Sequence, residues 1–392
     1  MSSTQPIARR ACRAHRFLVG AALAVFLAAC GGGGSGGDAP APAAPASLND
    51  TGVSASQCFA AGSDALVACD SVAARALSPL QDGALGRDAQ AATNAGGDGK
   101  LGFQFSTVPG GCVRDEVTGL VWESKPADNG VRDHALRYTN YGDRRAGDAS
   151  EFVDRVNGAA LCGFADWRLP TLQELHSLLD YGAMPVAAPW IDTAWFPNTS
   201  AAHYWTSTVV SPQLGLGSRV KWVQFNPRGF LIQPGDRSEL YGVRLVRGGS
   251  AAMPAPARFA VSADGQEVTD LQAKLAWRRC PEGMAFTGGI CTGSAVIATH
   301  EQALQLATAA AAAAGKPWRL PNAKELIGLA DPERRSPARE PNAFPGAASA
   351  TPFWSATPCG IGAAATVEFD VGSNACMARG VAGSVQLVRD LP

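Results

Sequence analysis

Residues Trp167-Arg168-Leu169-Pro170-Thr171-Leu172-Gln173-Glu174-Leu175 carry the pattern that decides the fold. The pattern returns as Trp318-Arg319-Leu320-Pro321-Asn322-Ala323-Lys324-Glu325-Leu326. Proline restricts the residue before it to extended conformations, while Thr171 and Asn322 are good helix N-caps followed three residues later by a glutamate. Each copy therefore predicts an extended segment that enters a helix through a capping box. We expect one domain repeated in tandem.

The tryptophan and arginine of this pattern have separate interpretations. Trp167 and Trp318 are expected to fill the core beside the predicted helix. Arg168 and Arg319 could bind a ligand, but a structural role beside a carboxylate is preferred, because two copies with different surroundings both keep the arginine. Pro170, Pro321, Glu174 and Glu325 complete the structural signature.

Further landmarks recur in the same order around both copies. A turn and a short strand ending in tryptophan open each repeat, at residues 115–122 (Trp122) and 270–277 (Trp277). A helix follows, which we expect Ser150 to cap in repeat one and Thr299 in repeat two. A Phe-Pro pair follows, Phe196-Pro197 in repeat one and Phe344-Pro345 in repeat two, and then an aromatic-Trp pair, Tyr204-Trp205 and Phe353-Trp354. Two alternating strands close each repeat: residues 220–225 and 241–247 in repeat one, and residues 366–369 and 384–389 in repeat two. Arg247 and Arg389 lie at or near the ends of the last strands.

An early strand, two helices and several late antiparallel strands in each repeat predict an α+β fold rather than a βαβ fold. Each repeat is long enough to bury its own core. The predicted organisation is a signal peptide, a lipidated tether, a first domain, a linker and a second domain: residues 1–29, 30–57, 58–248, 249–257 and 258–392.

The N-terminus has the features of an export signal. Arg9, Arg10, Arg13 and Arg16 precede a short apolar stretch, residues 17–29, which is too short to span a membrane. The stretch ends in Leu-Ala-Ala-Cys-Gly, which resembles a bacterial lipobox and makes Cys30 the predicted lipidation site. An ordinary secretory peptide is the alternative. Gly31 after the cysteine resembles outer-membrane sorting, with several acyl chains giving stable anchoring.

The amino-acid composition indicates a tether after the signal and argues against one class of function. Residues 31–57 are rich in Gly, Ala and Pro and are expected to be a flexible tether. Removing the four arginines of the signal lowers the basic residues from 33 to 29 against 34 acidic residues. The mature chain is therefore mildly acidic, which argues against a general nucleic-acid binder.

Eight cysteines remain after Cys12 in the signal and Cys30 are set aside, four in each half. In an exported chain this count predicts disulfides, and the absence of any Cys-x-x-Cys argues against a zinc site. Short spacing favours two pairs without fixing the connectivity, and the remaining cysteines would form the other two: Cys58–Cys69 and Cys280–Cys291, then Cys112–Cys162 and Cys359–Cys376.

Together these landmarks resemble the Lcl C-terminal domain family, named for a bacterial collagen-like adhesin. The resemblance covers residues 80–248 and 258–392. Repeat two departs from the family pattern at residues 270–275 and at Gln386, where repeat one has Arg244. The resemblance implies a C-type-lectin-like fold and exposure on the cell envelope. For the naming adhesin it also implies binding of sulfated polysaccharide.

Two ligand sites can be formulated from the sequence. Arg219, Lys221, Trp222 and Arg228 could bind a polyanion, since arginine pairs with sulfate and tryptophan stacks on sugars. A solvated strand face beside a core tryptophan is the preferred alternative. Calcium-dependent lectins use Glu-Pro-Asn, which occurs at residues 340–342, but no Trp-Asn-Asp follows and a chance tripeptide is preferred. A second basic loop, with Arg334, Arg335 and Arg339, is expected to be solvated.

Enzymatic chemistry is not expected. Formylglycine-generating enzymes share the lectin-like fold and a similar closing strand, but they need reactive cysteines, whereas each mature cysteine here has a disulfide or lipid role. The histidines of the mature chain, His134, His176, His203 and His300, lack metal-ligand spacing, and His176 is expected at or near the surface. No cofactor or metal is predicted.

The sequence thus predicts a lipid-anchored envelope protein, in the outer membrane, that recognises a polysaccharide or an envelope protein without catalysis. A structural or assembly component of the envelope is the alternative. Binding to nucleic acid is not predicted.

Overall fold

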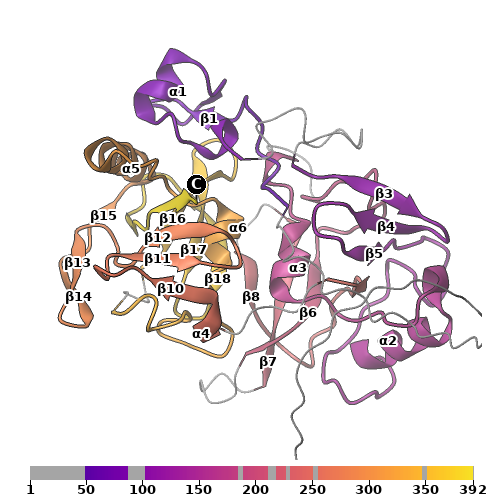
Figure 1. Cartoon of the computed structure of the whole chain (residues 1–392). Coiled ribbons are helices and arrows are strands. Elements are labelled where there is room, and N and C mark those ends of the chain that lie inside the picture. The colour runs from indigo at the N-terminus through magenta and orange to yellow at the C-terminus, as the bar shows by residue number, and fades with distance from the viewer. Residues whose placement is uncertain are drawn as a thin grey trace, which may run out of the picture. The chain divides into compact units, whose positions relative to one another are not determined.

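The computed structural model describes residues 49–86, 102–183, 189–210, 218–226, 230–249, 255–346 and 351–391 (Figure 1). The predicted signal, Cys30, Arg228 and most of the tether lie outside the described residues. Strands dominate and helices are few and short, which confirms the α+β prediction. Within these ranges, no helix combines the length and the apolar character needed to cross a membrane.

Repeat one, residues 102–249, opens with a small antiparallel sheet in the order β3-β4-β5-β9. Along the chain, its helices α2 and α3 follow β5 and precede the strands of a second, larger sheet. The elements are β3 (Phe105–Val108), β4 (Cys112–Asp115), β5 (Val121–Glu123), α2 (Ala149–Gly158), η3 (Leu161–Gly163), α3 (Leu172–Ser177), η4 (Tyr181–Ala183), β6 (His203–Val210), β7 (Arg219–Gln224), β8 (Phe230–Asp236) and β9 (Val246–Arg247).

Repeat two, residues 255–391, keeps the same order of main elements and adds the short helix α4, the hairpin β13-β14 and the two-residue strands β15 and β19. Its small sheet, β10-β11-β12-β20, corresponds to that of repeat one. The elements are α4 (Ala255–Arg258), β10 (Phe259–Val261), β11 (Glu267–Asp270), β12 (Leu275–Arg278), β13 (Met284–Thr287), β14 (Ile290–Gly293), β15 (Ile297–Ala298), α5 (His300–Ala314), α6 (Ala323–Ile327), β16 (Phe353–Pro358), β17 (Ala363–Glu368), β18 (Ser373–Ala378), β19 (Gly383–Ser384) and β20 (Val388–Asp390).

One eight-stranded sheet joins the two repeats, in the order β15-β19-β16-β17-β18-β8-β7-β6. The equivalent strands β8 and β18 pair antiparallel at the junction, where Asn374 lies opposite Ile232. A buried hydrogen-bond chain crosses the same junction: Tyr181 donates to Asn374 Oδ1 at 3.0 Å and contacts His176 Nε2 at 2.8 Å. The repeats are therefore joined through a continuous sheet and a buried polar network.

The local predictions from the repeated pattern are confirmed. Thr171 and Asn322 cap α3 and α6, and Glu174 and Glu325 complete both capping boxes. Thr299 caps α5, also with a capping box. The predicted cap of α2 is wrong by two residues, because the Asp148 carboxylate, a stronger acceptor than the Ser150 hydroxyl, accepts from the backbone N–H of Ser150 at 3.0 Å.

The closing strands are shorter than the alternating pattern predicts. In repeat one only Val246 and Arg247 form a strand, while Tyr241 and Gly242 make isolated bridges to other segments. The pattern still reports burial correctly: Val243, Leu245 and Val246 lie in the core. The alternating pattern of apolar residues therefore identified the buried face correctly but overestimated the length of the hydrogen-bonded strand.

The signature tryptophans fill the cores as expected. Those that are fully buried are Trp122, Trp167, Trp205, Trp277, Trp318 and Trp354. Trp205 Nε1 donates to the carbonyl of Tyr138 at 2.8 Å, and Trp354 Nε1 donates to that of Ala298 at 2.9 Å. The two repeats thus orient this tryptophan in the same way. At the repeat ends Arg247 pairs with Asp166, and Arg389 pairs with Glu267.

Four disulfides are present, with the pairing favoured by spacing. They join Cys58 to Cys69, Cys112 to Cys162, Cys280 to Cys291 and Cys359 to Cys376. All eight cysteines that the sequence assigned to disulfides are therefore oxidised.

The N-terminal segment, residues 49–86, differs from the prediction. It contains β1 (Cys58–Phe59), β2 (Leu66–Val67), α1 (Val72–Leu77) and η1 (Asp82–Ala84). Residues 49–57 are not a solvated tether, because Asn49, Thr51 and Val53 are buried. Asn49 donates to Asp115 of repeat one at 2.6 Å, so its amide is satisfied inside the protein rather than by water.

Residues 58–86 were expected to belong to the first domain, but they pack on repeat two. Phe59 and Leu77 join the hydrophobic cluster that contains Leu304 and Leu320. Helix α1 lies near α5, and Ser78 bonds to Thr308 of α5 at 2.9 Å. The apolar residues that precede repeat one in the sequence therefore complete the core of repeat two.

Candidate functional site

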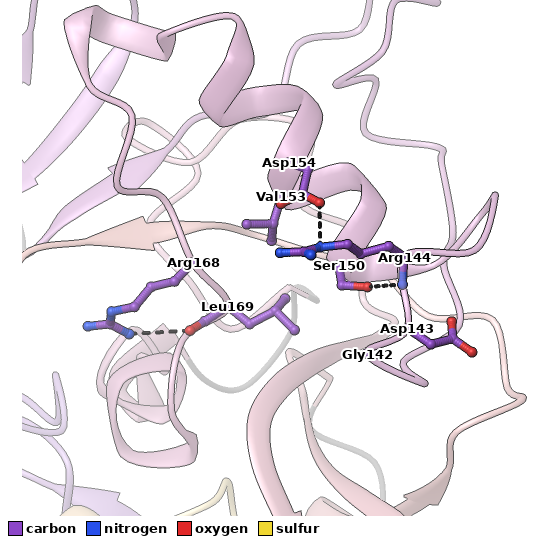
Figure 2. A pocket seen from close by; sticks show the side chains of 8 residues that line it. All are labelled: Gly142, Asp143, Arg144, Ser150, Val153, Asp154, Arg168 and Leu169. Atoms are coloured by element: carbon purple, nitrogen blue, oxygen red, sulfur yellow. Dashed lines mark hydrogen bonds and ion pairs between the residues drawn. The ribbon is translucent and has the colours of Figure 1, made fainter.

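A pocket of about 410 Å³ opens on repeat one between the loop before α2, helix α2 and the extended segment before α3 (Figure 2). Val153 and Leu169, both half-buried, supply apolar surface. Charged and polar side chains surround them. The lining residues are Gly142, Asp143, Arg144, Ser150, Val153, Asp154, Arg168 and Leu169.

The Asp148 carboxylate fixes the loop of the pocket to the start of α2. It accepts from the backbone N–H groups of Tyr141 at 2.6 Å and Gly142 at 3.2 Å, and from the Ser150 hydroxyl at 2.6 Å. Burial alone would raise the pKa of Asp148, but these hydrogen bonds outweigh it and hold the pKa below its ordinary value. The Ser150 hydroxyl in turn accepts from Arg144 N–H at 2.9 Å. The rim is thereby preorganised.

Arg144 and Asp154 form the exposed part of the rim. Arg144 Nε lies 2.8 Å from Asp154 Oδ2, and the two side chains are 75% and 52% exposed. Figure 2 shows Arg144 reaching over α2 toward Asp154. An ion pair this exposed contributes little stability, so either charge can exchange its partner for a ligand group.

Arg168 is held by the protein itself. Its guanidinium binds the Glu174 carboxylate through two hydrogen bonds of 2.8 and 2.6 Å and donates to the Gly248 carbonyl at 2.9 Å. Arg319 binds Glu325 in the same way at 2.7 and 2.8 Å, with Asp390 as a further partner. The preferred structural interpretation of both arginines is therefore confirmed.

The corresponding surface of repeat two can be identified residue by residue. The interval from the cap Asp148 to Trp167 equals that from the cap Thr299 to Trp318, so helix positions match without gaps. Val153 and Leu169 thus correspond to Leu304 and Leu320, which are each only 1% exposed.

The N-terminal segment covers this surface of repeat two. Phe59 and Leu77 pack in its hydrophobic cluster, Gly62 N–H donates to Glu301 at 2.9 Å, and Asp82 accepts from the Thr357 hydroxyl at 2.6 Å. In the described part of the chain no comparable segment covers Val153 and Leu169 of repeat one. The two repeats therefore differ at this surface. It is closed around Leu304 and Leu320 in repeat two and open around Val153 and Leu169 in repeat one.

The candidate polyanion site on strand β7 is not formed, because its lysine is buried. Lys221 is 1% exposed, and its ammonium donates to the carbonyls of Val371 and Gly372 in repeat two at 2.5 and 2.9 Å. Burial lowers the pKa of Lys221 to about 7. The preferred alternative, a solvated strand face beside a core tryptophan, is confirmed for Trp222, which is buried, and wrong for Lys221. The side chain of Lys221 joins the repeats instead of facing a ligand.

Trp222 packs in an aromatic cluster with His203 and Tyr241. The ring centroids of His203 and Trp222 are 4.1 Å apart, and those of His203 and Tyr241 are 4.8 Å apart. Trp222 is almost completely buried, and Arg219 is half-buried at the start of the strand. The described members of the predicted set, Arg219, Lys221 and Trp222, therefore share a strand but not an exposed face.

Two smaller predictions need correction. His176 is buried rather than at the surface, and burial together with the nearby Lys324 lowers its pKa to about 3. Arg339 is buried rather than solvated, with its guanidinium carbon within 5.1 Å of the ring centroids of three phenylalanines, Phe344, Phe353 and Phe369.

The other members of these sequence motifs are engaged within the protein. Glu340 of the Glu-Pro-Asn tripeptide accepts from Arg334 at 2.9 Å, and Arg335 pairs with Asp370. Among the residues described, no group of three or more His, Cys, Asp or Glu side chains is placed to hold a metal ion.

Sequence reasoning missed Val153, Leu169 and Thr208 as surface candidates. Each has a counterpart at the same position of repeat two, so the repeat pattern marks all of them as structural. The signal that distinguishes them is not local, because it depends on where the N-terminal segment packs.

Comparison with known proteins gives one family. The model of the Lcl C-terminal domain matches residues 111–247 and again residues 266–389, in agreement with the two structural repeats. No curated protein and no solved structure has a significant match to the chain.

Proposed function

The chain belongs to the Lcl C-terminal domain family, with the domain present twice, and from this premise we propose that it is a non-catalytic recognition protein of the bacterial cell envelope. In this proposal Cys30 carries the lipid anchor and the protein is held at the outer membrane. Each repeat has a C-type-lectin-like fold. Repeat one binds the ligand, and repeat two together with the N-terminal segment supports it.

The observation that carries this proposal is the difference between equivalent surfaces. A duplicated domain inherits the same surface twice. Here the Leu304–Leu320 surface is closed by the chain itself, whereas Val153 and Leu169 line an open pocket. Pockets that combine apolar surface with a few convergent polar groups are the usual form of binding sites. Repeat one is thus the half of the molecule that is suited to a ligand.

A non-catalytic role is supported by the state of the cysteines. An oxidase of the formylglycine-generating type would need a pair of reactive cysteines, and in the described chain all eight cysteines form disulfides. The pocket is also lined by arginines already engaged by carboxylates: Arg144 by Asp154, and Arg168 by Glu174. This arrangement favours binding over proton transfer.

The proposal is tested by binding of a purified envelope fraction, containing polysaccharide and protein, to the immobilised, oxidised full chain. Val153→Asp places a charge on the apolar part of the pocket and should abolish saturable binding. Val261→Asp is the matched control, because Val261 is an exposed valine of repeat two. Equal binding by both variants, or no binding by the unmodified chain, would overturn the proposal.

A second candidate is a structural or assembly component of the envelope. It is favoured by the N-terminal segment, which bonds to both repeats: Asn49 to Asp115 in repeat one and Asp82 to Thr357 in repeat two. Such a component would co-purify with one envelope protein irrespective of the Val153 substitution. The same pair of variants therefore separates the two candidates.

A further inference from the structure

We propose that the pocket of repeat one docks an acidic peptide segment of a partner protein, which places a leucine or phenylalanine on Val153 and Leu169 and a carboxylate beside Thr208. The proposal rests on the proposed function and specifies the ligand of the same surface. It follows from how the chain closes the equivalent surface of repeat two.

The N-terminal segment shows which chemistry fits this type of surface. Phe59 and Leu77 provide the apolar contact to the cluster that contains Leu304 and Leu320. Asp82 provides the acidic contact, since its carboxylate accepts from the Thr357 hydroxyl at 2.6 Å. One short stretch of peptide thus contributes both groups to the surface of repeat two.

The threonine that binds the Asp82 carboxylate in repeat two has a counterpart in repeat one. Thr208 corresponds to Thr357, and each hydroxyl accepts from the first backbone N–H of the helix before its strand: Leu172 N–H of α3 to Thr208 at 2.9 Å, and Ala323 N–H of α6 to Thr357 at 2.8 Å. Thr357 also donates its proton to Asp82. Thr208 is half-exposed, and within the described chain its hydroxyl donates to no acceptor. It is therefore positioned to donate to a carboxylate from outside.

The residue after Thr208 is also exposed. Val209 is 41% exposed, whereas its counterpart in repeat two, Pro358, is buried. The exposed Arg144 at the pocket rim can pair with an acidic residue of the incoming peptide in place of Asp154.

A peptide fits this pocket better than a sugar does. Sugar-binding surfaces use exposed aromatic rings, and aromatic side chains are absent from the pocket lining. The apolar surface is supplied instead by two aliphatic side chains, Val153 and Leu169, which match a leucine or phenylalanine of a peptide.

The probe for this proposal is a synthetic peptide with the sequence of residues 57–84 of this chain, with Cys58 and Cys69 oxidised. It contains Phe59, Leu77 and Asp82 in their natural spacing. Titration into the full oxidised chain, followed by calorimetry, should give saturable one-site binding. The intramolecular segment already occupies repeat two, so the added peptide should bind repeat one.

Matched variants locate the contact on both partners. In the protein, Val153→Asp should weaken binding at least about tenfold, and Val261→Asp should leave it unchanged. In the peptide, Leu77→Ala should weaken binding about tenfold or more, because burial of a leucine side chain is lost. Val72→Ala is the peptide control, since Val72 is 87% exposed on α1. If Val153→Asp fails to fold, Val153→Ala should still weaken binding.

Three outcomes would overturn the inference. The peptide could fail to bind, it could bind the Val153→Asp chain as well as the unmodified chain, or the chain could self-associate through Val153, which would assign the pocket to a second copy. If the peptide fails while the envelope fraction still binds in a Val153-dependent manner, the inference falls and the proposed function stands. If both fail, both are wrong.

Discussion

Arg244 and Arg339 place their guanidinium groups over equivalent phenylalanines from different positions in the two repeats. The Arg244 guanidinium carbon lies 5.0 Å from the ring centroid of Phe196, and that of Arg339 lies 5.1 Å from Phe344. In repeat two the closing strand has Gln386 where repeat one has Arg244, and Gln386 Oε1 accepts from Arg339 at 3.4 Å. Both repeats therefore place a buried guanidinium beside this phenylalanine, although the arginine comes from the closing strand in repeat one and from the loop before Phe344 in repeat two.

The two arginines should respond differently to replacement by methionine. Arg244 donates to the Glu123 carbonyl at 2.8 Å and to the Thr199 hydroxyl at 2.6 Å, and Glu123 lies buried nearby. Because both acceptors would lose their donor, Arg244→Met should lower the free energy of unfolding by about 1–3 kcal/mol. Chemical denaturation monitored by tryptophan fluorescence measures this change.

Arg339→Met should be neutral or stabilising at pH 7. Burial lowers the pKa of Arg339 from its ordinary 12.5 to about 9, so the cost of its buried charge builds up as the pH falls from 12.5 to 9 and is fully present at pH 7. In the described structure its Nε and Nη2 atoms have no hydrogen-bond partner, so little is lost with the side chain. A loss of stability comparable to that of Arg244→Met would show that the aromatic contacts outweigh the cost of the buried charge.

Lys221→Met should alter stability without altering polyanion binding. At pH 9 the variant should be less stable by about 1–3 kcal/mol, because the carbonyls of Val371 and Gly372 lose their donor. The pKa of Lys221 is lowered by burial from its ordinary 10.5 to about 7, so its contribution decreases as the pH falls from 10.5 to 7 and the gap should be narrower at pH 7 than at pH 9. Elution from immobilised heparin should match that of the unmodified chain; earlier elution of the variant would restore the polyanion site on β7.

Asp82→Asn should remove part of the pH dependence of stability. Burial first, and then the charge of Asp50, raises the pKa of Asp82 to about 7 from its ordinary 3.8. Because the protonated form is the one favoured in the fold, its contribution is fully present below pH 4 and is lost as the pH rises through 7. The variant should equal the unmodified chain near pH 4.5 and exceed it at pH 8. His176 and His300 titrate in both proteins, so the difference between their thermal unfolding curves isolates Asp82; parallel curves would refute the assignment.

Disulfide removal should depend on loop length. Cys112–Cys162 closes a separation of 50 residues and Cys280–Cys291 one of 11. Loop entropy predicts losses of about 4 and about 3 kcal/mol for the respective double alanine variants. Differential denaturation of the two variants measures the difference, and a larger loss for the shorter loop would contradict the entropic account.

The sequence predicted what depends on local patterns. The capping boxes at Thr171 and Asn322 require only residues that lie three apart, and short spacing favoured the pairs Cys58–Cys69 and Cys280–Cys291. The tandem architecture follows from the recurrence of such patterns. These features do not depend on how distant segments meet.

Apart from the cap of α2 and the length of the closing strands, the errors concern contacts between distant segments. The sequence around Lys221 predicts a surface residue, but the pairing of β8 with β18 brings the Val371 carbonyl beside its ammonium group. Residues 49–57 read as tether by composition, although Asn49 and Thr51 are buried between the repeats. The open pocket of repeat one depends on the same kind of contact, because the N-terminal segment packs on repeat two and leaves the equivalent surface of repeat one uncovered.

Hydroxyl-radical footprinting of the full oxidised chain, alone and with bound envelope fraction, tests the central claim most directly. In the free chain, Val153 and Leu169 should be oxidised readily, while Leu304 and Leu320 should be protected, and ligand should protect the first pair only. Equal oxidation of both pairs in the free chain, or ligand protection that leaves Val153 and Leu169 unchanged, would contradict the claim that repeat one carries the open recognition surface.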